Sequence, residues 1–207
     1  MPRRAVQTRD NHLSSSARLE QGLDDIVRAY FEAHPAHHEM AERWPIQGEM
    51  RVRLSLGSVW PPAQICSSVL AIVLGSRRSV LYLWPGSPTP SIGHLLIGGR
   101  PKGNETPEQT VVREVAEETG WRVSPVRMIG FRHFHQLEPR SERSDRPYPD
   151  FVQPILAARA IAFDPGLVIP EDRIPAELLD LADVERLLEP AQRPLLHAAT
   201  EACSVAG

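Results

Sequence analysis

The sequence predicts an α/β fold with a mixed sheet, a helical extension at its N-terminus and helices at its C-terminal end. Apolar, strand-like runs fill residues 51–99 and 121–163, and one well-capped helical segment, 107–119, lies between them. Helical patterns also flank these runs at both ends of the chain. We therefore expect residues 1–50 to form an N-terminal tail and helical extension, and residues 51–207 to form one folded domain with C-terminal helices.

Composition limits the function classes. The chain has 207 residues, of which 42% are apolar, and a net charge of −3, so no bulk field favours nucleic acid or an anionic membrane. No apolar run is long enough to span a bilayer, and polar residues follow Arg3 and Arg4 where a signal peptide would be apolar. Cys66 and Cys203 lie far apart, which predicts reduced thiols and a cytoplasmic protein.

The N-terminal elements follow from periodicity. Residues 1–16 are polar and aperiodic, which predicts a frayed tail. Residues 17–35 carry apolar side chains at helical spacing and predict an amphipathic helix. The pattern of residues 36–50 is weak, and we expect a connector with some helix there.

Strand signals begin at residue 51. The runs RVRLSLG, CSSVLAIVLG and SVLYLWPG predict three strands, and a short HLLIGG segment follows them. Beyond the central helix, WRVSPVRMIGFRHFH predicts one long or two short strands. FVQPILAARAIAF predicts another, in which Pro154 indicates an edge position or a bulge. PAELLDLADVERLL and RPLLHAATEAC predict two helices. The polar loop 136–150 is long enough to be functional or mobile.

The central helix, 107–119, has clear boundaries. Thr106 suits the N-cap and Gln109 completes a capping box with it. Pro107 suits the first helical position, and Gly120 suits a left-handed C-terminal cap. These local signals predict the start and the end of the helix.

Three glutamates, Glu114, Glu117 and Glu118, gather near the C-terminal end of this helix. At about 3.6 residues per turn they share one arc roughly 100° wide, while the opposite face is apolar. Like charges one turn apart, and anions near a helix C-terminus, each cost roughly a few tenths of a kcal/mol. A divalent cation would reverse the sign of both effects. Arg113 can hold the Glu117 carboxylate one turn away, and Glu105 lies within reach of the same side.

A glycine-rich loop, IGGRPKGN, precedes this helix, and its backbone can approach a phosphate or a metal closely. The residues alone therefore predict a Mg²⁺ or Mn²⁺ site for a phosphorylated substrate. Three glutamates without this loop would favour the alternative, a solvated charged face.

The segment from Gly99 to Trp121 resembles the box of the Nudix hydrolase family, G-x5-E-x7-R-E-U-x-E-E-x-G-U, where U is aliphatic. Every fixed position matches and Val115 fills the first aliphatic position, whereas Trp121 stands at the last one. The strand order extends the likeness to about residues 60–190. The resemblance implies an α/β/α sandwich that hydrolyses the pyrophosphate bond of a nucleoside diphosphate linked to another group.

The resemblance also implies roles for single residues. The positions that bind metal in the family correspond here to Glu114, Glu117, Glu118 and the backbone carbonyl of Gly98. Arg113 would orient the glutamates, and Glu105 would act nearby as a supporting or second-metal carboxylate. The implied cofactor is Mg²⁺ (or Mn²⁺), and the implied substrate is a small molecule derived from a nucleotide.

Several carboxylates are candidates for the group that accepts the proton of the attacking water. Because metal ions neutralise phosphate oxygens and lower the pKa of bound water, a carboxylate such as Glu114 could take the proton of that water. The competing bases outside the box are Glu138, Glu142 and Glu171.

Basic and aromatic residues after the box are candidates for substrate binding. His133 and His135 alternate along a strand and share one face. The arginines of loop 136–150 can clamp phosphates, and we expect the loop to close over the nucleotide with Tyr148 near the base. A polar strand face and a solvated loop are the alternatives. The candidates are Arg132, His133, His135, Arg140, Arg143, Arg146 and Tyr148.

The box alone predicts neither the subgroup of the family nor whether the chain turns over a substrate. The SQPWPFP pattern of the NADH enzymes is absent, so the subgroup is unassigned. A nucleotide-sensing or regulatory module without turnover is the alternative function, and the intact glutamates favour the enzyme. We expect neither membrane nor DNA as a partner, and we consider a homodimer.

Overall fold

The computed structural model describes residues 15–76, 78–84 and 92–205. The predicted frayed tail, 1–16, lies almost wholly outside these ranges. Contacts divide the chain into two compact units, Met1–Ala33 and His34–Gly207. The first contains helix α1, Ser15–Ala33, which confirms the helix predicted from residues 17–35.

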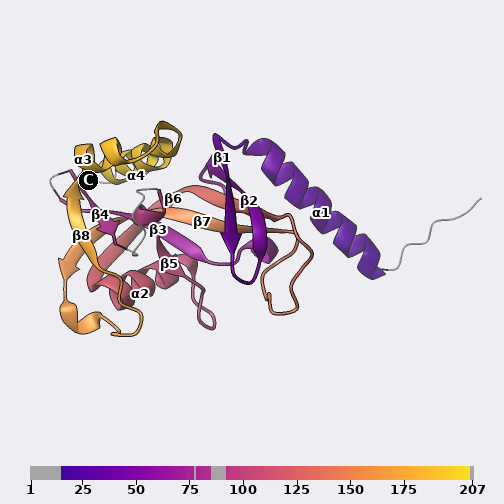
Figure 1. Cartoon of the computed structure of the whole chain (residues 1–207), viewed down its shortest axis with the longest axis horizontal. Coiled ribbons are helices and arrows are strands. Elements are labelled where there is room, and N and C mark those ends of the chain that lie inside the picture. The colour runs from indigo at the N-terminus through magenta and orange to yellow at the C-terminus, as the bar shows by residue number, and fades with distance from the viewer. Residues whose placement is uncertain (1–14, 77, 85–91, 206–207) are drawn as a thin grey trace, which may run out of the picture. The chain divides into compact units, whose positions relative to one another are not determined.

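Within the described residues, eight strands of the second unit form one mixed sheet (Figure 1). The order is β1-β2-β6-β7-β3-β4-β8, with β5 paired to β3. Strands β3 and β7 run parallel, and the other named pairs run antiparallel. The strands are β1 His38–Trp44, β2 Gly48–Leu56, β3 Val69–Leu74, β4 Ser79–Leu83, β5 Ile97–Gly99, β6 Trp121–Gln136, β7 Asp150–Phe163 and β8 Ala176–Asp180.

Helices cover both faces of this sheet (Figure 1). One face packs on α2, Pro107–Thr119, and the other on α3, Leu181–Leu187, and α4, Arg193–Val205. Side chains of β3 alternate between the two layers. Those packed with α2 are Val69, Ala71 and Val73. The intervening ones, packed with α3 and α4, are Leu70, Ile72 and Leu74. The predicted α/β/α sandwich is confirmed.

Two predicted elements are wrong. Residues 36–50 form β1 and the turn into β2, where we expected a connector with some helix. β1, an edge strand, alternates half-buried and exposed side chains, but charges on both of its sides obscure that pattern in the sequence. The first part of PAELLDLADVERLL is β8, and only Leu181–Leu187 is helical. Antiparallel pairing with β4 overrides the helical propensity of this Leu-rich run.

Pro154 lies in β7, which is interior to the sheet, so the edge alternative is wrong. The bulge alternative fits, because the register of β6 on β7 shifts between Met128 and Gly130, next to the partner of Pro154. The β3–β7 ladder begins at Ile155, one residue later. β6 is therefore one long strand with irregular pairing, which was one of the two predicted options.

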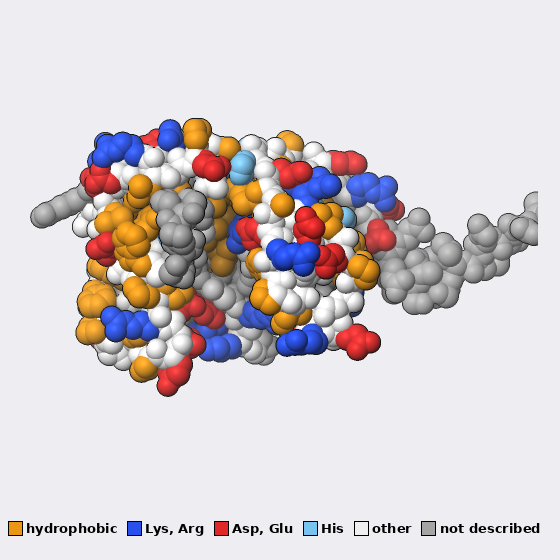
Figure 2. All heavy atoms as spheres, viewed as in Figure 1, with side chains coloured by type: hydrophobic (Ala, Val, Ile, Leu, Met, Phe, Trp, Pro, Cys, Tyr) orange, Lys and Arg blue, Asp and Glu red, His pale blue; other side chains and the backbone are white. Residues whose placement is uncertain are grey.

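The described part of the chain offers no helix with the length and apolar content needed to cross a membrane. On the face seen in Figure 2, acidic and basic side chains are intermixed. This face therefore presents no broad field of one sign.

Candidate functional site

Helix α2 positions the glutamates through its two ends and its buried face. The Thr106 hydroxyl oxygen accepts from the Gln109 N–H at 3.2 Å, and the Gln109 side chain accepts from the Thr106 N–H at 2.9 Å, which confirms the capping box. Gly120 ends the helix at φ 78°, as predicted. Val111 and Val115 are fully buried, so the glutamates face away from the sheet.

Arg113 joins three of the box carboxylates. Its Nη1 donates to Glu114 and Glu117 at 2.7 and 3.0 Å, and its Nε donates to Glu105 at 2.7 Å. Nη2 donates to Glu105 at 2.9 Å and to the carbonyl oxygen of Arg100 at 3.0 Å. The predicted contact between Arg113 and Glu117 thus belongs to a larger network that fixes the glycine-rich loop on the helix.

Two carboxylates of this network have lowered pKa values. The Arg113 side chain, and after it the Lys102 backbone N–H, lower the pKa of Glu105 to about 2. Burial pushes the pKa of Glu117 up, but hydrogen bonds from Lys102 and Arg113 outweigh it and hold this pKa below its usual value. Both groups are therefore ionised at neutral pH.

Glu118 differs from them. Burial first, and then the neighbouring carboxylates, raise the pKa of Glu118 to about 8, and one of these neighbours is Asp172. The loop that carries Asp172 is docked on the end of α2. The Ile169 N–H donates to the Glu117 carbonyl oxygen at 2.8 Å, and the Ile174 N–H donates to that of Glu118 at 2.9 Å. Asp172 lies outside the box and was not among the predicted site residues.

Gly98 and Gly99 bring backbone against the glutamates. At Gly98, where φ is 146°, an added Cβ would lie 2.2 Å from the Val69 carbonyl oxygen, so only glycine fits. At Gly99 an added Cβ would lie 2.4 Å from a carboxylate oxygen of Glu114. The Glu114 carboxylate therefore lies directly on the loop backbone.

The donors at this end of α2 fit a hard divalent cation in their chemistry, since they are carboxylate and backbone oxygens. The Glu114 carboxylate occupies the space left open by the missing Cβ of Gly99, so helix and loop offer oxygens side by side. Among the described residues, however, no three metal-ligating side chains converge. Arg113 holds Glu114 and Glu117, and metal binding would require these hydrogen bonds to rearrange.

His133 and His135 lie on one face of β6, as predicted, and share one carboxylate. His133 Nε2 and His135 Nδ1 lie 2.6 and 3.0 Å from Asp150 Oδ1. Burial pushes the pKa of Asp150 up, but the two imidazole hydrogen bonds hold this pKa below its usual value. Asp150 was not among the predicted site residues, although it directly precedes the strand run FVQPILAARAIAF.

Arg132 is committed to internal contacts. It pairs with Glu42, donates to Gln153 Oε1 at 3.4 Å, and places its guanidinium carbon 4.7 Å from the centre of the Phe134 ring. Its side chain is mostly buried. A substrate contact by Arg132 would require these contacts to break.

Arg146 is held in a similar way on the same side of the sheet. Its guanidinium carbon lies 5.0 Å from the ring centres of both Trp44 and Phe151, and its Nη1 donates to Ser67 Oγ at 2.8 Å. These are cation–π contacts with a hydrogen bond beside them. Arg146 therefore packs loop 136–150 onto the sheet.

The rest of loop 136–150 is tied to the box or faces solvent. Asp145 forms a two-pronged ion pair with Arg100 of the glycine-rich loop, with Nη2 and Oδ1 2.9 Å apart. Arg140 donates to a carbonyl oxygen within the loop at 3.4 Å. The side chains of Arg143 and Tyr148 are exposed. The structure thus brings the loop next to the box through Arg100, a residue that the sequence had not singled out.

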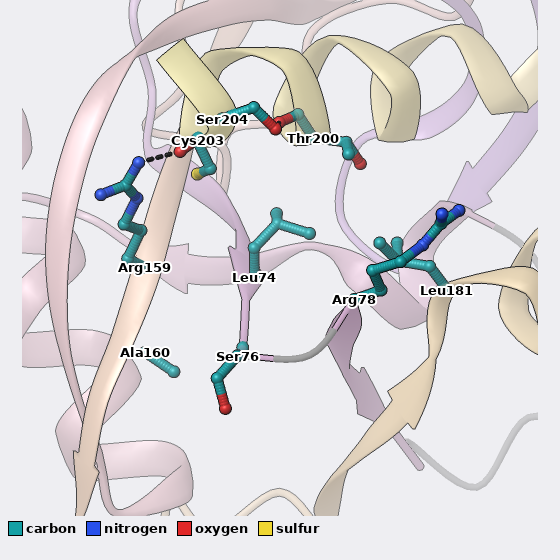
Figure 3. Close-up of a pocket in the computed structure, with 10 residues that line it drawn as sticks. Leu74, Ser76, Arg78, Arg159, Ala160, Leu181, Thr200, Cys203 and Ser204 are labelled. Carbon is teal, nitrogen blue, oxygen red and sulfur yellow. Dashed lines mark hydrogen bonds between the residues drawn. The ribbon is translucent and has the colours of Figure 1, made fainter. Parts of the chain in front are cut away.

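A separate cavity of about 350 Å³ opens beside α4, on the sheet face opposite α2 (Figure 3). Figure 3 shows Arg159 and Arg78 on its two sides, with Thr200 and Ser204 along the helix. None of the predicted site residues lines it. The candidate site is therefore on the α2 side.

Comparisons with known proteins bear on this site. The family model described as NUDIX domain matches residues 65–199, and no curated protein matches the chain. Similar solved structures include a NUDIX hydrolase from Nitrosomonas europaea, with 16% identity over 66% of this chain and 89% of that chain and a TM-score of 0.44. The Bacillus subtilis pyrophosphohydrolase BsRppH is 16% identical over 81% and 98%, with a TM-score of 0.46. A UDP-X diphosphatase is 12% identical over 72% and 67%, with a TM-score of 0.45. The family match spans the glutamates, both glycines and the loop of Asp172.

Proposed function

Since this chain belongs to the Nudix family and is a hydrolase of that type, we propose that it cleaves the pyrophosphate bond of a nucleoside diphosphate linked to another group, with Mg²⁺ or Mn²⁺ as cofactor. One observation carries the proposal. An excess of carboxylates at the end of α2 lies against a glycine backbone, and burial, with these carboxylates after it, raises the pKa of Glu118 to about 8. Such excess charge is what a divalent cation would balance.

The proposed roles follow from the contacts. Glu114, Glu117 and Glu118, with the Gly98 carbonyl, would hold the ion. When bound, it would neutralise phosphate oxygens and lower the pKa of the attacking water. Glu105, ionised through its contact with Arg113, keeps that guanidinium aligned along the glutamates.

Glu114 is our proposed proton acceptor. Its carboxylate lies on the Gly99 backbone, where helix and loop meet. The competing Glu138 is bound to Arg43 at 2.7 Å, and Glu142 and Glu171 are exposed on loops. These contacts favour the box residue over the alternatives.

A phosphate-release screen over nucleoside diphosphate derivatives tests this function. With millimolar Mg²⁺ or Mn²⁺ we expect turnover of at least one derivative, and with EDTA we expect none. The metal should also raise the melting temperature, because it binds only the native arrangement. Turnover that persists in EDTA would refute the metal requirement.

One observation favours a second candidate, a nucleotide-sensing module without turnover. The glutamates bind Arg113 and Lys102, and among the described residues they do not converge as a metal site. Nucleotide binding that needs no divalent metal, together with no turnover across the screen, would establish this alternative.

Three smaller proposals accompany the main one. We assign hydrolysis to the predicted domain, 51–207, because it contains all the matched residues, 65–199. A cytoplasmic location is supported by Cys66 and Cys203, both free thiols. A homodimer stays a prediction, which sedimentation equilibrium would test.

A further inference from the structure

The cavity beside α4 has no role in the proposed hydrolysis. Its volume, about 350 Å³, suits a small molecule. Its walls come from β3, β7 and the start of α3, with the end of α4 along one side (Figure 3). Among the described residues, none between Gly98 and Trp121 lines it. A ligand in this cavity therefore leaves the glutamates of α2 free.

Apolar side chains make up most of the cavity wall. Leu74 comes from β3, and Leu181 begins α3. Two hydroxyl groups of α4, those of Thr200 and Ser204, also line the cavity (Figure 3). Thr200 Oγ1 donates to the Leu196 carbonyl oxygen at 2.9 Å, and Ser204 Oγ donates to the Thr200 carbonyl oxygen at 2.8 Å. Their protons are used within the helix, so the guanidinium groups of the wall are its strongest hydrogen-bond donors.

The two arginines of the wall differ in their contacts. Arg159, on β7, donates to the Cys203 carbonyl oxygen near the end of α4 (Figure 3). Arg78 lies on the other side of the cavity, in the turn between β3 and β4, and is exposed. Within the described ranges, the Arg78 guanidinium meets neither a carboxylate nor another hydrogen-bond acceptor. One of the two cations is thus left for a ligand.

The backbone of Arg78 is held in a conformation that disfavours an arginine. Its φ is 59°, and in the described part of the chain it is the only non-glycine residue with a positive φ. The Gly75 N–H donates to the Ser79 carbonyl oxygen at 2.8 Å across the turn, and the Leu181 N–H donates to the Arg78 carbonyl oxygen at 2.9 Å. Glycine would adopt this φ at no steric cost. A non-glycine residue held in this way is typical of ligand-binding positions.

Charges around the cavity select the ligand. Glu185 and Glu201 line an adjoining cavity, which shares Arg78 with the first, and Glu185 is bound to His197 at 2.8 Å. The last carbonyl groups of α4 add partial negative charge. These groups repel the double charge of a phosphate more strongly than the single charge of a carboxylate. A carboxylate also accepts two parallel hydrogen bonds from one guanidinium. The cavity therefore fits a molecule with one carboxylate and an apolar body.

We propose that this cavity is a second binding site, for a small carboxylic acid with an apolar body. The carboxylate binds Arg78, and the apolar body lies against Leu74 and Leu181. The site is separate from the one proposed for hydrolysis, so binding can be measured without turnover.

Isothermal titration calorimetry on the full chain in EDTA tests this with octanoate as the probe. The uncharged and dianionic probes of the same chain length are 1-octanol and octyl phosphate. We expect octanoate to bind with a Kd below about 1 mM, and octyl phosphate to bind more weakly. Arg78→Gln should raise Kd for octanoate about tenfold, the loss of one charged hydrogen bond, and leave Kd for octanol within about twofold. Arg186→Gln, which removes an exposed arginine of α3 outside the cavity, is the matched control.

Two further measurements locate the probe. Thr200→Leu fills the cavity and should weaken octanoate and octanol alike, by about tenfold. Octanoate at about ten times its Kd should slow the alkylation of Cys203 by iodoacetamide about tenfold, because Cys203 lines the cavity. Cys66 is not among the described residues that line the cavity, so its alkylation rate should stay unchanged. Mass spectrometry measures both rates, and melting curves check that each variant is folded.

Several outcomes would overturn the inference. Octanoate that does not bind saturably refutes the site, and so does equal octanoate binding by Arg78→Gln and wild type. Tighter binding of octyl phosphate refutes the choice of a carboxylate. Unchanged octanoate binding by Thr200→Leu, or an unchanged alkylation rate of Cys203, would place the probe elsewhere and also refute the site. None of these measurements uses turnover, so a failure of the proposed hydrolysis would leave this test intact.

Discussion

The end of α2 and loop 136–150 are both densely charged, yet their charges are used differently. At α2 the carboxylates outnumber their cations, Arg113 and Lys102, and burial together with the neighbouring carboxylates raises the pKa of Glu118. In the loop, Asp145 pairs with Arg100, and Arg146 packs against two aromatic rings. Unbalanced charge indicates a ligand, whereas balanced charge holds the chain together. Substitutions in both regions test this difference.

The largest effect should come from the glutamates. Glu117→Gln and Glu118→Gln keep the shape of the side chain but remove a charge, and an amide is a poorer ligand for a hard cation. We expect kcat to fall roughly 100-fold or more in each, since loss of ligand support typically costs about 10–100-fold in metal affinity alone. Phosphate release measures it. Glu142→Gln, on the exposed loop, is the control, and an equal loss there would contradict the special role of the α2 glutamates.

Removing the guanidinium of the α2 network should destabilise the fold. Arg113→Met leaves three carboxylates close together with Lys102 as the remaining cation, and the Arg113 side chain is only 17% exposed. We expect a loss of about 2–3 kcal/mol, below the range for a fully buried pair. At roughly 2–4 °C per kcal/mol, the melting temperature should fall by several degrees. Mg²⁺ should restore more stability in this variant than in wild type, and a smaller metal effect would contradict the prediction.

Metal-free protein should lose stability as pH rises. The pKa of Glu118 is raised from 4.5 to about 8, so ionisation costs more in the folded than in the unfolded chain. This contribution to stability is fully present below the unfolded pKa and is lost as pH rises through about 8. Thermal melts in EDTA should therefore show a decline between about pH 4.5 and pH 8 that levels off at higher pH. Glu118→Gln should flatten that decline, and parallel curves for the two proteins would refute the assignment.

The smallest effect is expected in the loop. Arg146→Ala loses two ring contacts and the hydrogen bond to Ser67, so we expect a loss of about 1–2 kcal/mol with kcat nearly unchanged. Arg143→Ala, at an exposed position, should stay within about 0.5 kcal/mol. Melting curves and kinetics on both variants measure this. A large rise in KM at unchanged stability would show instead that Arg146 clamps phosphates, as the sequence had suggested.

The central helix could be predicted because its determinants are local. Thr106, Gln109 and Gly120 lie within or next to the helix they delimit, and helical geometry alone places the glutamates on one arc. Strands β3 and β4 could be predicted equally well, since buried strands form continuous apolar runs. The α/β/α layering itself came from the family resemblance.

What could not be predicted depends on contacts between distant segments. β8 is a strand because β4 pairs with it, and nothing within its own five residues requires that. Asp172 reaches Glu118 through a loop outside the box, and Asp145 meets Arg100 across 45 positions. Arg132 contacts Glu42 of β1 and Gln153 of β7, and Arg146 contacts Trp44 of β1 and Phe151 of β7. The sequence therefore predicted which charged side chains are present. It did not predict which of them are already paired with an opposite charge.

The hydrogen bonds that dock the Asp172 loop on α2 have a consequence for dynamics. The amides of Ile169 and Ile174 close the last carbonyls of the helix, so neither amide can exchange with solvent deuterium until the loop leaves the helix end. Both should be slowed by one common protection factor, as a single opening unit. If cation binding draws the glutamates together, the opening becomes rarer and the two amides slow in step. Deuterium exchange of these two backbone amides would thus report whether a cation is bound at the end of α2. No ligand side chain has to be substituted for this measurement.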